Sequence, residues 1–429
     1  MLRENNAGSV MEIKAQASAN STQEGGFDCL THFGRHAFRA DDELWTEAQY
    51  VEDMVIVVAG YAPYTALKDV PLSFKKLFSQ LYGRRVDIIV LTTTASDANM
   101  FYLTLATEKV RARKKKSKAR KMKEGQVLIC DGCYVAGRGV MRSRSGTARL
   151  ADTAYHAALK QYIVPAPWGY EYENELSTGI FADDLTVFEQ KCLTCVSKTF
   201  HQLEADGIFI GVLLVELIRV DNAQGLRRAY VRALRNLTTR LCIHFCIDDA
   251  MMSIRCGAPL SYQLYGEDCA PDYVTIGKHY LVAGVLRIAA KRTNTSAYSS
   301  ITAVAEGGLI AKSSAILRAV IKRNLVKSCL NCGLLLKMKL RDAGFDVHGC
   351  GLFLYCASTN GLTGAFGSGI RMSFGRLIPH LTIDSSMIVK LRINRNSSNC
   401  DAATLGASKR DDRLRKRKGF LTSSRSRKK

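Results

Sequence analysis

The sequence contains neither a long hydrophobic run nor an apolar leader. Its longest apolar stretch, Ile208–Val215, is too short to span a bilayer, so we expect no transmembrane helix. Residues 1–23 are polar, and they resemble neither a secretory signal nor an Arg-rich, acid-poor mitochondrial presequence. Cysteines number 14 without a secretory signal, which indicates free thiols in a reducing compartment. We therefore expect a cytoplasmic protein with no membrane partner.

A paired zinc-knuckle motif is also missing. Three cysteine pairs have the CxxC spacing, but a zinc site needs two such pairs, or one pair and histidines, close together. The pairs lie far apart in this chain: Cys130/Cys133, Cys192/Cys195 and Cys329/Cys332. Because cysteine is a common small core residue, we expect buried thiols and predict no metal site.

Acidic residues are in short supply. The chain has 39 Asp and Glu against 61 Lys and Arg, a formal net charge of +22. Much of the excess lies in a run over 111–123 and in the tail from Lys409 to Lys429. Such blocks usually stay solvated, although nucleic acid could contact them. We expect a solvated insertion and a frayed tail, and nucleic-acid contact is the less favoured alternative.

The composition that remains is that of a globular protein, with 47% hydrophobic and 23% charged residues. Apolar residues at helical spacing over 226–241 predict a helix between two strands. Short apolar runs rich in β-branched residues alternate with such helical segments, which is typical of a mainly parallel sheet covered on both faces. The runs are Met54–Val58, Val86–Leu91, Gln126–Cys130, Gly207–Val215, Leu241–Ile247 and Tyr273–Ile276.

Four parts follow one another along the predicted chain. Residues 1–50 carry no sustained period and are expected to form a poorly ordered lead. The strand and helix runs place a large α/β domain over 51–305. A long helical stretch from Ala311 to Leu340 opens a smaller α+β domain over 306–395. The basic tail occupies 396–429.

Polar residues follow three of the predicted strands. Small hydroxyl residues at 92–99 lead into a helix, and backbone N–H groups at such a helix start can bind phosphate. Asp248 and Asp249 end a second strand, where a carboxylate is costly unless a cation or a protonated ring pairs with it. Lys278 ends a third, where a partly desolvated amine can act as a nucleophile. Because these strand ends share one sheet edge, they predict a site for a phosphorylated cofactor with a basic ring nitrogen.

The order and spacing of these segments resemble the class III aminotransferases of fold type I. Gly211–Glu216 is similar to that family's strand ending in Val-Glu-Pro, and Cys246–Asp249 to its strand ending in Asp-Glu. Pro271–Lys278 is similar to the Pro-Asp run that closes on Gly-Lys, and Thr93–Asn99 to the phosphate-cup motif. The resemblance extends over about 55–390 and implies an α/β fold type I structure, with a mainly parallel central sheet and a smaller α+β domain.

The resemblance assigns the cofactor and the residues that hold it. It implies pyridoxal 5′-phosphate (PLP), bound to Lys278 as a Schiff base, with Asp248 paired to the pyridinium nitrogen. Ala95 and Ser96 would donate hydrogen bonds to the phosphate, and Tyr134 would stack on the ring. Thr295 resembles the threonine that reaches the phosphate of the neighbouring subunit. This last likeness implies a homodimer with shared active sites.

The substrate-binding residues implied by the resemblance are Arg371, for a substrate carboxylate, and Glu216, as a gate that masks an arginine. An Asp-Asp pair where most relatives have Asp-Glu is most similar to the diaminobutyrate–2-oxoglutarate aminotransferases. It implies transfer of an ω-amino group, such as that of a diamino acid, to a 2-oxo acid. Arg376 competes with Arg371 for the carboxylate role.

Several positions depart from the family pattern. Leu217 stands in place of the proline after Glu216, Ala95 in place of the glycine of the cup, and Val135 in place of a histidine. An eroded aminotransferase that serves as a binding or scaffold protein through its basic segments is therefore one alternative. A fold type I racemase or aminomutase, which uses the same lysine and aspartate, is another.

Overall fold

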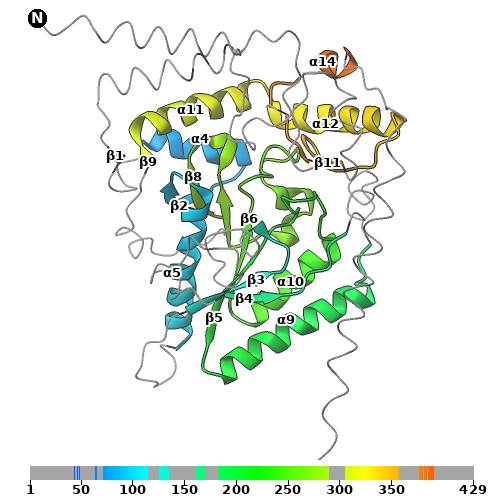
Figure 1. Cartoon of the computed structure of the whole chain (residues 1–429). Coiled ribbons are helices and arrows are strands. Elements are labelled where there is room, and N and C mark those ends of the chain that lie inside the picture. Colours follow the sequence, from blue (N-terminus) through cyan, green and yellow to red (C-terminus); the bar gives the residue numbers. More distant parts are fainter. Residues whose placement is uncertain are drawn as a thin grey trace, which may run out of the picture.

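The computed structural model describes residues 43, 46, 48, 63–64, 71–114, 125–134, 161–169, 182–288, 305–356, 376–379, 381–383 and 385–390. Within them, a central seven-stranded sheet has the strand order β2-β8-β7-β6-β5-β3-β4 (Figure 1). The strands are β2 (Asp87–Thr92), β3 (Gly125–Cys130), β4 (Gln161–Val164), β5 (Phe209–Val215), β6 (His244–Asp248), β7 (Tyr273–Ile276) and β8 (Ala283–Arg287).

Parallel pairing dominates this sheet. Strands β4, β3, β5, β6 and β7 pair with parallel neighbours, and only β8 runs antiparallel to β7 and β2. The side chains of β5 are buried on both of its faces from Ile210 to Val215. A continuously apolar strand is expected when helices cover both faces of a parallel sheet. The mainly parallel sheet predicted from the sequence is thereby confirmed.

Helices cover both faces of the sheet (Figure 1). Helix α5 (Ala95–Lys114) packs on one face, and α9 (Val187–Ala205) and α10 (Arg228–Arg240) lie on the other. Helix α9 begins with a capping box, in which the Thr186 hydroxyl accepts from the Glu189 N–H and the Glu189 carboxylate accepts from the Thr186 N–H. Helix α10 is the predicted helix between two strands, and it buries one apolar stripe: Ala229, Tyr230, Val231, Leu234 and Leu237.

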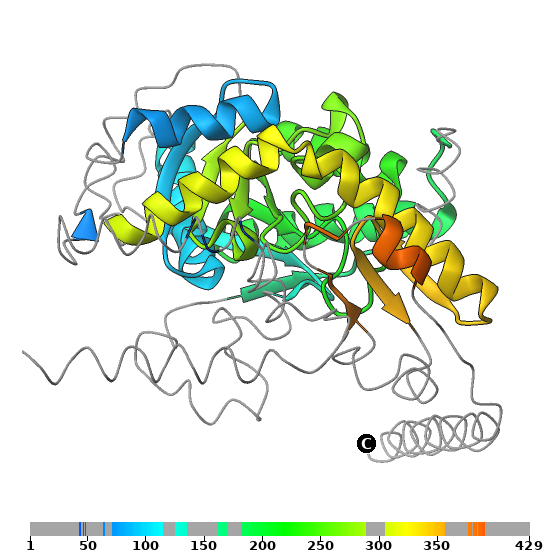
Figure 2. The same cartoon turned by 90° about the horizontal axis from the view of Figure 1, so that it is seen from above.

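A second layer lies across the end of the sheet. Seen from above, α11 (Gly307–Lys322) and α12 (Leu325–Asp342) run one after the other, with α4 (Leu72–Tyr82) beside α11 (Figure 2). The helical stretch expected over 311–340 consists of two helices, because the helical path is interrupted at Arg323–Asn324. Asn324 has a φ of 51°, a left-handed conformation that asparagine tolerates better than most residues and that ends the helical path.

The remaining described elements are short. Strands β10 (Val347–Cys350), β11 (Phe353–Cys356) and β12 (Arg376–Leu377) form an antiparallel sheet that packs on α12, close to α14 (Ser385–Lys390). β1 (Pro63–Tyr64) pairs with β9 (Ala305–Glu306), and single 3₁₀ turns occur at η2 (Ser261–Leu264), η3 (Glu267–Cys269) and η4 (Lys278–Tyr280). The predicted boundaries at 50, 305 and 395 stay predictions.

Some sequence expectations fall on parts of the chain that lie outside the described residues. These are the strand at Met54–Val58, most of the lead over 1–50, the tail over 396–429 and positions 115–123 of the basic run. Arg111 to Lys114, the first part of that run, form the last turn of α5 and not a loop. Among the described helices, none is both long and apolar enough to cross a membrane.

Candidate active site

Three segments that are distant in sequence meet at Gly277, directly after β7. A Cβ atom built on Gly277 would lie 3.2 Å from the Cβ of Ala95 and 3.4 Å from the Cβ of Ala250. The start of α5, the turn after β6 and the end of β7 therefore converge here. Lys278 follows with a φ of 58°, in the left-handed region that non-glycine residues seldom adopt. Strained backbone of this kind tends to occur at functional positions.

The Asp248 carboxylate, at the end of β6, is fixed on both oxygens. Its Oδ2 accepts a hydrogen bond of 2.7 Å from Asn99 Nδ2, and its Oδ1 accepts one of 3.2 Å from the Ala250 N–H. Burial raises the pKa of Asp248, while the two hydrogen bonds and the positive charge of Lys278 oppose that rise. The carboxylate therefore lies close enough to the Lys278 ammonium to interact with it, in surroundings that favour a cationic partner.

At the start of α5, close to Lys278, two backbone N–H groups have no hydrogen-bond partner among the described residues. Thr94 caps the helix, because its Oγ1 accepts from the Asp97 N–H at 3.1 Å and its carbonyl accepts from the Ala98 N–H at 3.1 Å. The N–H groups of Ala95 and Ser96 precede the first intrahelical hydrogen bond and are available to a ligand. Helix N-termini of this type bind phosphate through such N–H groups and the helix dipole.

Glu216, at the end of β5, is buried and holds two backbone segments. Its Oε1 accepts from the Tyr134 N–H at 2.6 Å, and its Oε2 accepts from the Val220 N–H at 3.1 Å. Burial and the nearby negative charge of Asp248 raise the pKa of Glu216 well above its ordinary value, although both backbone bonds lower it. Glu216 thus fixes the backbone of Tyr134, whose side chain is half exposed.

The structure brings together five of the eight predicted site residues around one sheet edge: Ala95, Ser96, Glu216, Asp248 and Lys278. Tyr134 is connected to this edge through Glu216. Thr295 and Arg371 lie outside the described residues, so their roles stay predictions. Within the described parts of the chain, no group of three or more His, Cys, Asp or Glu could hold a metal ion, and the twelve cysteines there are free thiols.

Sequence reasoning did not single out the hydrogen-bond partner of Asp248. Asn99 is 3% exposed, and its Oδ1 accepts from the hydroxyl of Thr275, which is 0% exposed, at 2.6 Å. Thr275 is a polar residue in the otherwise apolar strand β7, and this exception is the feature of the sequence that could have indicated a buried hydrogen bond. Nothing in sequence spacing could place it against Asn99, because that contact depends on how α5 packs on the sheet.

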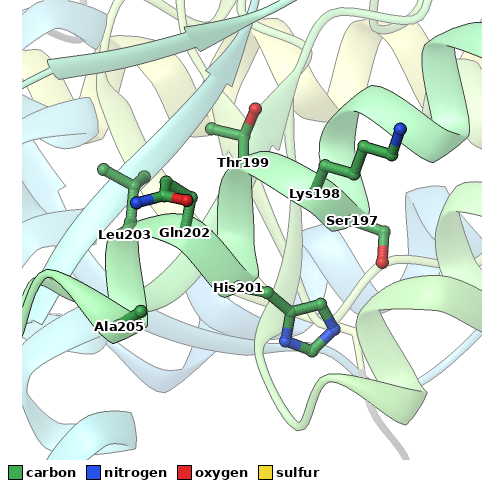
Figure 3. Close-up of a pocket in the computed structure, with 7 residues that line it drawn as sticks. All are labelled: Ser197, Lys198, Thr199, His201, Gln202, Leu203 and Ala205. Carbon is green, nitrogen blue, oxygen red and sulfur yellow. The ribbon is translucent and has the colours of Figure 1, made fainter.

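A surface depression lies along α9, away from this edge (Figure 3). It is lined by residues of that helix alone: Ser197, Lys198, Thr199, His201, Gln202, Leu203 and Ala205. Their polar side chains point in different directions and do not converge on a common point (Figure 3). The residues that could bind a cofactor or act as a nucleophile lie instead at the carboxyl ends of the parallel strands.

Comparison with known proteins shows which fold carries this site. No family model matches the sequence, and no curated protein matches it. The structure is similar to a lysine aminotransferase from M. tuberculosis in the internal aldimine form, with a TM-score of 0.64, 15% identity, and coverage of 86% of this chain and 88% of that one. An ω-transaminase from Pseudomonas jessenii in complex with PMP gives 0.61, 14%, 86% and 87%. A Bacillus anthracis aminotransferase gives 0.62, 15%, 84% and 86%.

The chain has the fold of these aminotransferases. The fold type I prediction is therefore confirmed. The similarity extends over most of both chains in each comparison. In this fold, Asp248 is the last residue of β6 and Lys278 lies two residues after the end of the adjacent parallel strand β7, with Asp248 and Thr275 as register partners. Both side chains thus belong to the edge of the sheet at which α/β proteins bind their ligands.

Proposed function

We propose that this chain is a PLP-dependent aminotransferase. The observation that carries the proposal is the meeting of three groups at one sheet edge: the Lys278 amine, the Asp248 carboxylate and the free N–H groups of Ala95 and Ser96. An amine, a carboxylate and an anion-binding helix start are the donor set that a phosphorylated pyridine aldehyde requires. The aminotransferase fold supports the same reading.

Each group of the cofactor has a counterpart among the described residues. The Ala95 and Ser96 N–H groups would bind the phosphate, and the Ser96 hydroxyl would add a further donor. The Asp248 carboxylate would accept from the pyridinium N–H, because the surrounding burial penalises an unpaired charge there. Lys278 Nζ would hold the cofactor covalently. Bound PLP supplies an electron sink for the charge that develops on the substrate carbon.

The protein residues then divide the remaining work. Lys278 Nζ is the group that would take up and give back the proton of the substrate carbon. Asp248 would hold the proton on the ring nitrogen. The half-exposed Tyr134 ring would cover the cofactor ring, and its backbone is anchored by Glu216 for that position.

The finer assignments are parts of the same proposal. We assign Arg371 to the substrate carboxylate, because a planar guanidinium fork binds a carboxylate in a bidentate manner. Thr295 would reach the phosphate across the interface of a homodimer. The Asp248–Asp249 pair, which resembles that of the diaminobutyrate aminotransferases, favours a donor with an ω-amino group, such as a diamino acid, and a 2-oxo acid as acceptor.

Reduction with borohydride in the presence of PLP tests the proposal. The reduced cofactor should remain attached to wild-type protein after denaturation, and peptide mapping should place it on Lys278. Lys278→Ala should fold yet trap no cofactor, and its transamination should fall by several orders of magnitude, about 10³-fold or more. Lys198→Ala, on the exposed side of α9, is the matched lysine control and should behave as wild type. An adduct on another lysine, or none at all, means that the proposal is wrong.

A further inference from the structure

Three side chains behind Asp248 form a continuous hydrogen-bonded chain. Asn99 Nδ2 lies 2.7 Å from Asp248 Oδ2, Asn99 Oδ1 lies 2.6 Å from Thr275 Oγ1, and Thr275 Oγ1 lies 2.9 Å from Tyr102 Oη. Asn99 is 3% exposed, and Thr275 and Tyr102 are 0% exposed. The chain is therefore shielded from water, where a hydrogen bond is electrostatically stronger and an unpaired group costs more than at the surface.

The donor and the acceptor in each of these hydrogen bonds can be assigned by starting from Asp248. A carboxylate accepts only, so the Asn99 amide must present its NH₂ group to Asp248 and its carbonyl to Thr275. A carbonyl accepts only, so the single hydroxyl proton of Thr275 points to Asn99. The Tyr102 hydroxyl must then donate to Thr275. Burial raises the pKa of Tyr102 well above its ordinary value, so this donor keeps its proton throughout the working pH range.

Elements of the core hold these residues in place. Asn99 and Tyr102 are one turn apart on α5, the helix whose start carries Ala95 and Ser96. Thr275 is the register partner of Asp248 across the β6–β7 pair. Helix α5 thus connects its own start, with Ala95 and Ser96, to the Asp248 carboxylate. It does so through Asn99, which bonds to Asp248 on β6 and to Thr275 on β7.

We propose that Asn99 is a positioning residue that aims the Asp248 carboxylate at the cofactor ring nitrogen, and that Thr275 and Tyr102 fix the Asn99 amide for this role. The inference rests on the proposed function, because Asp248 has a ring nitrogen to meet only if PLP binds. Without the Asn99 donor, Asp248 Oδ2 would lose its partner and the carboxylate could rotate about χ2. Without Thr275 or Tyr102, the amide would be free to turn its carbonyl towards the carboxylate.

A pair of cofactors separates this role from simple support of the fold. Cofactor-free protein is titrated with PLP, and separately with its 1-deaza analogue, in which a carbon replaces the ring nitrogen. Binding is followed by the quenching of protein fluorescence. Asn99→Ala should weaken PLP binding by about tenfold or more, the loss expected for one hydrogen bond to a charged group. It should weaken binding of the analogue by less than about twofold, since the analogue makes no bond to Asp248.

Matched variants test the rest of the chain. Thr275→Val and Tyr102→Phe delete one hydroxyl each and should show the same preference for loss of PLP over loss of the analogue. Thr238→Val and Tyr230→Phe delete hydroxyls from equally buried residues of α10 and should leave both affinities unchanged. Asn99→Gln tests whether an amide alone is enough, and it should not restore PLP binding, because the longer side chain cannot keep both contacts.

The outcomes distinguish this proposal from the proposed function. If wild-type protein binds neither compound and traps no cofactor on Lys278, the proposed function itself fails. If wild-type protein binds PLP and Asn99→Ala loses PLP and the analogue to the same extent, Asn99 only supports the fold and the positioning role is wrong. If Asn99→Ala binds PLP as tightly as wild type does, the positioning role is also wrong.

Discussion

The carboxylate of Asp272 accepts hydrogen bonds of 2.8 and 3.0 Å from the two terminal nitrogens of Arg235. Its Oδ2 also accepts from the Phe245 N–H at 2.9 Å. Asp272 belongs to the Pro-Asp segment that leads into β7, Arg235 lies on α10, and Phe245 lies on β6. One carboxylate therefore joins a covering helix to β6, which ends in Asp248, and to β7, which precedes Lys278. This is a structural reason for an aspartate at this position.

Replacing Asp272 should destabilise the fold in a pH-dependent way. Burial alone would raise the pKa of Asp272, but the neighbouring His244 ring, the hydrogen bonds from Arg235 and the Arg235 charge outweigh it and hold the pKa well below its usual range. A carboxyl group with a lowered pKa stabilises the fold fully above its unfolded pKa of about 3.9, and that contribution is lost progressively as the pH falls from there through the lowered folded pKa. Asp272→Asn should lose about 2–3 kcal/mol at pH 7, measured by urea unfolding, and a smaller amount at pH 3, where part of the contribution is already lost.

An exposed ion pair supplies the control for Asp272. Asp183 is 68% exposed and pairs with Arg232 at 2.9 Å. Asp183→Asn should change the free energy of unfolding by less than about 0.5 kcal/mol at either pH. Equal losses in the two variants would contradict the role given to Asp272.

Asp249 should have the opposite pH dependence. Burial raises its pKa to about 7, and the hydrogen bond from the Ser261 N–H only partly offsets this. Its Oδ1 has no hydrogen-bond partner among the described residues. A carboxyl group with a raised pKa costs stability as the pH rises from about 4 to about 7, because folding then requires the ionised form to be buried. Asp249→Asn should match wild type at pH 4 and exceed it by about 1–3 kcal/mol at pH 8 in cofactor-free protein. A difference that is equal at both pH values would contradict this assignment.

The backbone at Lys278 should favour glycine over alanine. Its φ of 58° costs a residue with a Cβ about 1 kcal/mol, which glycine does not pay. Lys278→Gly should therefore unfold at higher urea concentration than Lys278→Ala, although neither variant has the amine. Comparing these two variants with each other removes any other effect of losing the lysine. Equal midpoints would mean that the left-handed conformation is not kept in solution.

The elements of the fold that could be predicted from the sequence are those marked by residues next to one another in the chain. Continuous apolar runs predicted β2, β3, β5, β6 and β7 because such runs belong to strands buried on both faces. Strand β8 was not predicted, since Ala283–Arg287 follows Lys278 closely and contains a glycine. The break at Asn324 was also missed, because neither proline nor glycine marks it.

The same distinction applies to the candidate site. The position of Lys278 and Asp248 at one sheet edge could be predicted, because each lies at or just after the end of a parallel strand. Their roles stay predictions. The contact between Asn99 and Asp248 could not be predicted, because it depends on the packing of α5 over β6 and β7. Residue spacing along the chain carries no information about that distance.

Part of the basic run should be dispensable and part should not. Arg113 is anchored, because it bonds to the Leu241 carbonyl at 3.3 Å, pairs with Glu204 and lies over the Phe200 ring at 5.6 Å. Replacing 115–123 by a Gly/Ser linker should leave transamination and stability unchanged and lower only non-specific polyanion binding. Arg113→Ala should lose about 1 kcal/mol of unfolding free energy, through the packing of α5 on α9. A tenfold loss of turnover in the linker variant would place a site element within 115–123.

Glu216 offers a choice between two roles that kinetics can separate. Both of its oxygens accept backbone N–H groups, those of Tyr134 and Val220, so we expect its main task to be holding the Tyr134 backbone. Glu216→Gln keeps one carbonyl acceptor for two donors, and it should lose about 1–2 kcal/mol of stability, with KM for the amino donor and for the 2-oxo acid changed alike. A gate that masks an arginine predicts a different result, in which KM changes for only one substrate while the unfolding free energy stays the same. Tyr134→Phe, which keeps the backbone N–H, is the control and should leave stability unchanged. A one-sided change in KM in Glu216→Gln would therefore favour the gate and reject the backbone role.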